Sequence, residues 1–498
     1  MSVLNLIFST YGYVAVAVVL LIISIRRYIR RREEPPGPFC IPFFGYLPLM
    51  FDKRQFREIT ADLFKTYGPI VQVQRGEVTQ ILLCTNQVIK EALKRPDFIN
   101  HPPKLFAEVL TGAGEDRIIA ANDATWHKSR KVALHALGQF ASSKNAKLEE
   151  NVHKCLHWLL KRWQESNGEP VTTKGDLMSC TAAVIASLSF GSQADPDDPF
   201  LAKVSEIMGE FVANAARYIW ISDTFPSLNP FLKGKKKGLI EQYKIFVNSV
   251  MERVLSYKPN QEICTIVDSL YKAEAELPEA EWKFFGENDI KRIAVDLYDG
   301  GFFTIAENIE FLLLLMACYP EIQKKAQQEI DNIVNETELP NMHEHWDKLV
   351  YSKACVFEEL RFVTNFGTSL PRLMEKDTEF GGYILRKGSE VIPLFHCANH
   401  EGSNFEDHEI FSPERFITKE GAFDRVKTEE IIAFSSGKRR CPGESMAKQQ
   451  MFLMFTAIMQ KFEVKLDKTS VDGDPLRGID LGGFLSPSVH KLHFFSRK

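Results

Sequence analysis

Apolar positions in the middle third of the chain recur three and four residues apart, with polar positions between them. This period predicts amphipathic helices over residues 145–165, 176–190, 239–257, 289–319 and 320–334, the last opened by a proline suited to a first helical turn. Short strand-like stretches lie at residues 70–76, 79–84 and 382–395. We therefore expect a mainly α fold with a minor β part at its edges.

The amino terminus has a different pattern, because residues 2–25 contain no charged side chain. As a helix rising 1.5 Å per residue, this segment would span roughly 36 Å, enough for a hydrocarbon core of about 30 Å. Five arginines follow within residues 26–32 and favour the cytosol on that side. We expect a single transmembrane anchor over residues 1–25. A cleaved secretory signal is the alternative, but its apolar region would be shorter and preceded by basic residues.

Three prolines, at positions 35, 36 and 38, follow these arginines. Proline fixes φ and removes a backbone donor, so this segment is expected to be a stiff, extended connector. No internal repeat or low-complexity segment interrupts the rest of the chain. The expected organisation is an anchor (1–25), a basic and proline-rich linker (26–38) and one catalytic body (39–498).

Composition narrows the function classes. With 45% hydrophobic and 25% charged residues the chain has a globular balance, and a net charge of −4 without basic bias argues against a nucleic-acid partner. The nine cysteines are odd in number, widely spaced and free of any C-x-x-C pair, which argues against a disulfide framework or a structural zinc site. They are Cys40, Cys84, Cys155, Cys180, Cys264, Cys318, Cys355, Cys397 and Cys441.

Cys441 has a distinctive setting, in residues 433–445, AFSSGKRRCPGES. Gly437 can adopt the positive φ of a tight turn, and Gly443 permits close approach of the backbone to a flat ligand. A helix is expected over residues 444–462, so the thiol would lie at its amino end, where the helix dipole and the preceding cations favour a thiolate. A thiolate is a soft ligand suited to iron. The alternative is a basic surface turn with an incidental cysteine.

This loop resembles the haem-binding loop of the cytochrome P-450 superfamily, F-x-x-G-x-R-x-C-x-G. The matching residues are Phe434, Gly437, Arg439, Cys441 and Gly443. The resemblance implies a cytochrome P-450 fold and a haem b cofactor whose iron takes its axial thiolate from Cys441.

Three companion motifs follow the order of that family. The first is E-x-x-R, whose Glu358 and Arg361 face the same side of a helix and can form an ion pair. Arg415, in FSPERF, is the residue that locks this pair in relatives, and the three would brace the haem site. A solvated salt bridge is the alternative for the pair alone.

The other two motifs concern the haem propionates. W-x-x-x-R matches Trp126 and Arg130, and LPR ends in Arg372. The resemblance makes these three, with Arg439, candidate donors to the propionates, since the planar guanidinium suits carboxylates. An ordinary strand-edge charge is the alternative for Arg372.

The segment from Asp289 carries Gly300, Gly301 and Thr304, matching the family's oxygen-side motif A/G-G-x-D/E-T except at one position. Two glycines within a helix cost roughly 2 kcal/mol against alanine, so they need a reason. The resemblance makes Thr304 a hydrogen-bond partner of dioxygen, although a bond back to the preceding turn is the alternative. Phe303 replaces the family's acid, and Asp299 lies roughly 140° around the helix from Thr304.

By resemblance, we expect a monooxygenase that hydroxylates a lipophilic molecule such as a steroid, fatty acid or xenobiotic at the cytosolic side of the endoplasmic reticulum membrane. No dinucleotide fingerprint is present, so electrons would come from NADPH–cytochrome P-450 reductase, with cytochrome b5 as a further candidate partner. Two alternatives stay open: an isomerase or dehydratase acting on a peroxide, and a non-catalytic haem carrier or sensor.

Two surfaces follow from this expectation. Five cations would form a positive docking patch for an acidic redox partner: Lys128, Arg130, Lys131, Lys438 and Arg440. Apolar and aromatic segments around residues 98–110 and 211–221, and Phe302, would line the substrate pocket.

Overall fold

The structure is a computed structural model that describes residues 33–41, 43–102, 118–119, 121–122, 124–141, 147–191, 195–257, 263, 265–276 and 287–497, together with Val14 and Val18. Apart from those two valines, the expected anchor (1–25) lies outside the described residues, as does the arginine-rich part of the linker. The boundaries expected for anchor and linker therefore stay predictions.

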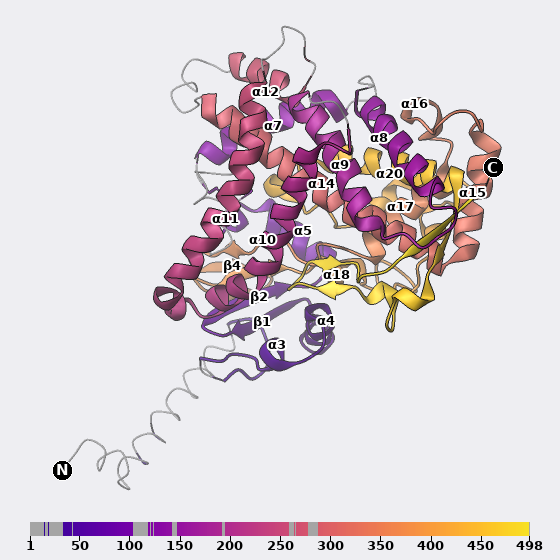
Figure 1. The fold of residues 1–498 in the computed structure, drawn as a ribbon. Coiled ribbons are helices and arrows are strands. Elements are labelled where there is room, and N and C mark those ends of the chain that lie inside the picture. The colour runs from indigo at the N-terminus through magenta and orange to yellow at the C-terminus, as the bar shows by residue number, and fades with distance from the viewer. Residues whose placement is uncertain are drawn as a thin grey trace.

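Helices dominate the described chain (Figure 1). They are α3 (Pro48–Phe51), α4 (Phe56–Tyr67), α5 (Asn86–Lys94), α7 (Ala124–Ala141), α8 (Lys147–Gln164), α9 (Thr173–Phe190), α10 (Pro199–Thr224), α11 (Asn229–Ser256), α12 (Ile266–Ala275), α14 (Glu287–Cys318), α15 (Pro320–Ile333), α16 (Met342–His345), α17 (Val350–Phe362), α18 (Phe395–Asn399), α19 (Arg425–Thr428) and α20 (Glu444–Lys461).

The strands form small sheets. In the largest, β1 (Ile70–Arg75) pairs antiparallel with β2 (Val78–Leu83), β2 pairs parallel with β6 (Glu390–Pro393), and β6 pairs antiparallel with β3 (Arg372–Leu373). The other three sheets have two strands each: β4 (Thr378–Phe380) with β5 (Tyr383–Leu385), β7 (Phe462–Leu466) with β10 (Leu492–Ser496), and β8 (Ile479–Asp480) with β9 (Leu485–Ser486). The expected mainly α class with a minor β part is confirmed.

Helix α14 is the centre of the molecule. It packs against α9, α11, α20 and β7, and its residues 311–316 are all fully buried. Within the described residues, it is also the one helix long and apolar enough to cross a bilayer, but two-thirds of that stretch is inside the protein. A long apolar stretch that is mostly buried inside the protein belongs to a core helix.

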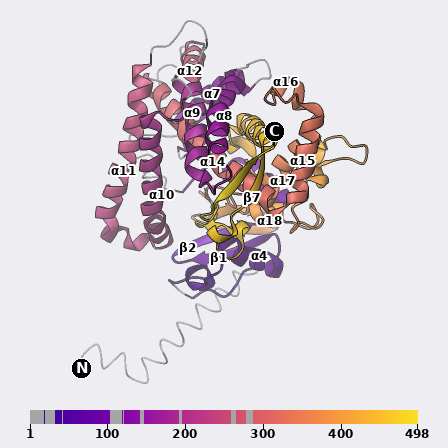
Figure 2. The same cartoon turned by 45° about the vertical axis from the view of Figure 1, so that its right-hand side comes forward.

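Helices α7, α8, α9 and α14 gather above the sheet of β1 and β2, and α10 and α11 run side by side along one flank (Figures 1 and 2). The amphipathic pattern explains α8, which buries Leu148, Val152 and Leu159 on one face. It carries acidic residues in its first turn and basic residues in its last, both complementary to the helix dipole.

The predicted elements are found with small shifts at their ends. The helices expected over 145–165, 289–319 and 320–334 correspond to α8, α14 and α15, and the expected helix 444–462 corresponds to α20. The segments 176–190 and 239–257 are the later parts of longer helices, α9 and α11. The strands expected at 70–76 and 79–84 are β1 and β2, whereas 382–395 splits into β5, β6 and the start of α18.

Glu359, on α17, is a buried acid outside the predicted site. Its side chain is fully buried, and neither carboxyl oxygen has a hydrogen-bond partner in the described structure. Burial therefore raises the pKa of this carboxyl well above its usual range. The folded state holds the proton more tightly than the unfolded chain, so this group costs stability as the pH rises above the unfolded pKa.

We predict that Glu359→Gln raises the unfolding temperature at pH 8 by roughly 2 °C or more, because the amide cannot ionise. The gain should shrink as the pH falls toward 4, where the unfolded carboxyl also becomes protonated. Calorimetry at both pH values tests this, with the exposed Glu409→Gln as matched control. An equal gain at the two pH values would contradict the explanation.

Candidate functional site

The cysteine loop joins the segment after α19 to the start of α20. A short 3-10 helix, η4 (Gly437–Arg439), lies at its centre, and the amide of Cys441 donates to the carbonyl of Phe434 over 2.8 Å. Gly437 has a φ of 69°, and a Cβ there would lie 1.9 Å from the carbonyl oxygen of Leu93 at the end of α5. The turn that the sequence predicted at Gly437 is present, and α5 leaves no room for a side chain.

Gly443 differs from Gly437. Its φ of −88° is open to any residue, and it is the N-cap of α20. A Cβ built there would meet only the Cys441 Sγ, at 4.0 Å. No steric contact within the described protein therefore requires glycine, and a side chain at this position would occupy space beside the sulfur. A flat ligand bound to the sulfur would need this space, and glycine at position 443 leaves it open.

Cys441 is exposed to solvent, although many protein atoms lie near its sulfur. Burial raises the pKa of the thiol, while the Gly443 amide, Arg130 and Arg440 act to lower it. As expected, the helix end and the cations favour a thiolate, but in the protein alone desolvation of the sulfur outweighs them and the pKa is raised. A metal cation at the sulfur would reverse this balance.

Arg439, Arg372, Arg130 and Trp126, from three of the predicted motifs, converge beside the loop. The Arg439 guanidinium carbon lies 3.7 Å from the centroid of the Trp126 ring, and Arg130 donates to the carbonyl of Arg440. Burial and the neighbouring Arg372 and Arg130 lower the pKa of Arg439 to about 9, and burial lowers that of Arg372 to about 10. These guanidiniums therefore lie in a setting that disfavours their own charge.

The described residues supply no carboxylate to Arg372 or Arg439. Arg439 instead donates to the carbonyls of Ile99 and Ile118, and the buried Nε of Arg372 has no hydrogen-bond partner in the described part of the chain. A buried and a half-buried cation without counter-charge, together with a buried donor without acceptor, fit an anionic group bound between them. Haem propionates have this chemistry, so the residues present fit haem.

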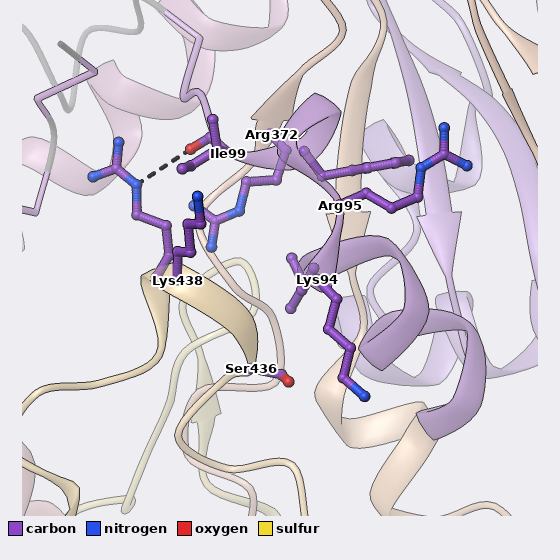
Figure 3. A pocket seen from close by; sticks show the side chains of 9 residues that line it. Lys94, Arg95, Ile99, Arg372, Ser436 and Lys438 are labelled. Atoms are coloured by element: carbon purple, nitrogen blue, oxygen red, sulfur yellow. Dashed lines mark hydrogen bonds between the residues drawn. The ribbon is translucent and has the colours of Figure 1, made fainter. Parts of the chain in front are cut away.

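A narrow cavity of about 10 Å³ lies among these cations, lined by Leu93, Lys94, Arg95, Phe98, Ile99, Arg372, Ser436, Lys438 and Arg439. Figure 3 shows Arg372 reaching toward the loop that carries Ser436 and Lys438, while Lys94 and Arg95 point away from it. The dashed line there is the hydrogen bond from Arg439 to the carbonyl of Ile99. The cavity is the meeting point of α5, β3 and the cysteine loop.

His101 also belongs to this cluster, although no sequence motif predicted it as a site residue. Its Nδ1 lies 2.8 Å from the carbonyl of Pro371, and its Nε2 lies 2.7 Å from Nη1 of Arg372. The ring therefore donates to the carbonyl and accepts from the guanidinium. Burial and the cations Arg372 and Arg439 lower the pKa of His101 to about 3, so it is neutral. The sequence carries no motif that links position 101 to position 372; only the fold brings them together.

The ion pair predicted from E-x-x-R is present and fully buried. Arg361 donates to both carboxyl oxygens of Glu358 over 2.7 Å, and Arg415 donates to the same carboxylate over 3.0 Å. Arg361 also donates to the carbonyl of Asn399, whose side chain accepts from the amide of Ile432, two residues before Phe434. A chain of hydrogen bonds thus runs from the ion pair to the start of the cysteine loop.

The oxygen-side motif lies on α14. The hydroxyl of Thr304 donates to the carbonyl of Gly300 over 3.0 Å, which is the back-bonded alternative weighed from the sequence. A Cβ at Gly301 would lie 3.1 Å from Ile185 of α9, whereas one at Gly300 would meet nothing within 4 Å. Packing therefore accounts for Gly301 but not for Gly300.

Phe303 and Asp299 complete the view of this helix. The ring of Phe303 packs against that of Phe484 with 5.6 Å between centroids. Asp299 accepts a hydrogen bond from the hydroxyl of Tyr243 on α11 over 2.8 Å. As expected, Asp299 is turned toward another element and does not replace the acid missing at position 303.

The expected substrate-pocket segments are described only in part. Residues 103–117 lie outside the described residues, as do the side chains of 212–217. Phe98, Phe211 and Phe302 are buried. Of the expected docking cations, Lys438 is exposed, and Arg440 donates to Glu444 over 2.7 Å.

Known proteins are similar to this chain over nearly its whole length. The family model described as Cytochrome P450 matches residues 35–493. The chain is similar to Cytochrome P450 2C23 of Rattus norvegicus, with 27% identity over 97% of this chain and 98% of that protein. It is 28% identical to Cytochrome P450 2B15 of Rattus norvegicus over 100% of this chain and 99% of that protein. Cytochrome P450 2J5 of Mus musculus is 27% identical, over 91% and 89% respectively.

The two loop glycines make a matched prediction. Gly437→Ala forces a non-glycine residue into the left-handed region and against Leu93, so we expect a loss of at least about 1–3 kcal/mol of stability. Gly443→Ala should leave the stability of the haem-free protein within about 0.5 kcal/mol, since it strains nothing, but should weaken haem binding. Denaturant unfolding and haem titration of both variants test this. Equal stability of the two haem-free variants would refute the assignment.

Proposed function

Because the chain belongs to the cytochrome P450 family, we propose that it is a membrane-bound haem-thiolate monooxygenase that hydroxylates a lipophilic small molecule such as a steroid, fatty acid or xenobiotic. Dioxygen is the oxidant, and electrons come from NADPH through a reductase. The observation that carries the proposal is the convergence of a thiol, Cys441, with the buried Arg372 and the half-buried Arg439, neither of which has a carboxylate partner among the described residues.

The residues of the haem site divide into two roles. Cys441 would supply the thiolate ligand of the haem iron, and its loop is held by the turn at Gly437 and by Asn399. Arg372 and Arg439, with Trp126 and Arg130, hold the propionates. When bound, the haem supplies the redox chemistry that activates dioxygen, and the thiolate ligand favours O–O cleavage. The protein orients the groups and excludes water.

On α14, Thr304 is the candidate partner of dioxygen. Its hydroxyl needs only to rotate from the Gly300 carbonyl to donate elsewhere. Gly300, beside which a Cβ would meet no protein atom within 4 Å, keeps this face of the helix open. The face is therefore free to receive a ligand.

One observation favours a second candidate function. Phe303 cannot deliver protons, and an isomerase or dehydratase that acts on a peroxide would need none from outside and no reductase. The retained Thr304 supports the monooxygenase. Turnover that depends on reductase, NADPH and dioxygen would decide for it, whereas turnover of a hydroperoxide without them would decide for the alternative.

An exposed aromatic surface supports membrane association. Phe39 is 75% exposed, Phe51 69% and Phe231 85%. The ring of Phe43 packs at a tilt against that of Phe225 with 5.2 Å between centroids, and this contact joins the segment after the linker to the α10–α11 connection. Apolar surface of this kind favours lipid contact. We propose that this face rests on the cytosolic side of the endoplasmic reticulum membrane, next to the anchor expected over residues 1–25.

The first prediction from the proposed function concerns the ligand of the haem iron. Cys441→Ser should abolish the absorption maximum of the reduced, carbon-monoxide-treated protein near the wavelength that names the family, because a hydroxyl is a poor ligand for iron. Arg440→Gln, beside it, should retain that maximum. A serine variant with the wild-type spectrum would exclude Cys441 as the ligand.

The second prediction concerns the electron donor. Lys438 is exposed beside the cysteine, so Lys438→Glu should slow reduction by NADPH–cytochrome P450 reductase several-fold at low salt, with an effect that fades as ionic strength rises. Lys468→Glu makes the same charge change at an exposed lysine in another part of the fold. Stopped-flow reduction under carbon monoxide measures both. Equal rates for the two variants would count against docking at Lys438.

A further inference from the structure

A buried polar cluster lies on α14 beyond the oxygen-side motif. Glu307 is 1% exposed and Glu310 3% exposed, although the core around α14 is apolar. Their neighbours come from two other parts of the chain: Thr173 and Lys174 from the start of α9, and Ser486 and His490 from the carboxyl-terminal region. None of these residues takes part in the haem site described above.

Glu307 connects the interior to the surface. Its Oε2 accepts from the hydroxyl of Ser486 over 2.8 Å, and its Oε1 lies 2.7 Å from Nζ of Lys174. Lys174 also donates to the Ser486 hydroxyl over 3.0 Å, and its side chain is 38% exposed. A cation in contact with water is therefore in direct contact with a carboxylate that water does not reach.

Glu310 is the second acid of the cluster. Its Oε1 accepts from Thr173 over 3.4 Å and lies 3.7 Å from Nε2 of His490, and its Oε2 has no hydrogen-bond partner in the described structure. Burial raises the pKa of Glu310 to about 8, Lys174 opposes this and Glu307 adds to it. Burial lowers the pKa of His490. At neutral pH the cluster therefore holds a proton on Glu310.

Glu307 lies on α14 close to position 303, where this chain has phenylalanine in place of the acid of the family motif. It follows Phe303 by four positions and Thr304 by three, and such residues are neighbours on one face of a helix, with about 5–6 Å between Cβ atoms. The same carboxyl-terminal segment covers both acid positions: Phe484 packs on Phe303, and Ser486 binds Glu307. One water molecule can bridge a carboxyl group and a hydroxyl at this separation.

We propose that Glu307, held by Ser486 and supplied by Lys174, relays protons from solvent to the Thr304 face of α14, in place of the acid that Phe303 lacks. The inference rests on the proposed monooxygenase function. Each hydroxylation combines RH, O₂, two electrons and two protons into ROH and H₂O. For each proton, Lys174 Nζ protonates Glu307 Oε1, the carboxyl passes it on through water, and solvent restores the ammonium.

The decisive variant is Glu307→Gln, which keeps the shape of the side chain and removes its proton transfer. The test uses the full-length protein with NADPH–cytochrome P450 reductase and measures the rate of NADPH oxidation without added substrate. In this reaction O₂, two electrons and two protons give H₂O₂. General acid catalysis typically contributes 10²–10⁴-fold, so a fall of at least about tenfold is expected. The reduced carbon-monoxide spectrum should be unchanged.

Two further variants separate a relay from a structural role. Phe303→Glu in the Glu307→Gln background returns an acid to the neighbouring position and should restore most of the rate. Glu359→Gln, which removes an equally buried carboxyl on α17, should leave the rate as in the wild type. A fall in rate that Phe303→Glu does not repair would refute the relay.

A measurement that needs no turnover tests the protonation of the cluster. Infrared difference spectra of the resting protein should show a protonated carboxyl band that titrates near pH 8 and is absent from Glu310→Gln. Its persistence in that variant would contradict the assignment.

Different results would refute the monooxygenase function and the proton relay. If the wild-type protein forms the carbon-monoxide spectrum but shows no NADPH- and dioxygen-dependent turnover with any substrate, the monooxygenase function fails. If it turns over and Glu307→Gln matches it across pH 6–9, only the relay fails.

Discussion

Arg361 places its guanidinium between the carboxylate of Glu358 and the backbone carbonyls of Asn399 and His408, and the two charged side chains are fully buried. Removing one partner of such a pair typically costs about 3–5 kcal/mol, against a total stability of about 5–15 kcal/mol. Asn399 passes this constraint to Ile432, and so to the cysteine loop. The ligand position therefore depends on an ion pair that touches neither the sulfur nor its immediate neighbours.

The cationic cluster of Arg372 and Arg439 differs from this ion pair, because the described protein supplies no negative charge to balance its positive charge. Arg372 and Arg439 have lowered pKa values, and His101, which contacts Arg372, is held neutral. A site assembled in this way is unfavourable by itself and becomes favourable when anions enter. Cofactor binding and folding are coupled for this reason, since a group that binds only the folded state stabilises it.

Helix α14 is both the apolar core of the fold and the carrier of buried polar groups. Its apolar residues make it the core of the fold, while Thr304, Glu307 and Glu310 bring polar groups into its second half. Burying a carboxyl group within such a core costs free energy unless the group is paired or hydrogen-bonded. The absence of an acid at position 303 and the presence of one four residues later are consistent with a single requirement, a proton donor on this face.

The sequence by itself determined the fold class, the long helices, the family and the residues of the four motifs, because helical periodicity is local and those motifs are short and ordered. Only the tertiary structure decided which distant groups meet. Neither His101 beside Arg372 nor Lys174 and Ser486 around Glu307 has a local pattern, since the partners lie 271, 133 and 179 positions apart. The direction of the Cys441 pKa also needed the structure, because local sequence shows the cations near a thiol but not the solvent that folding removes from it.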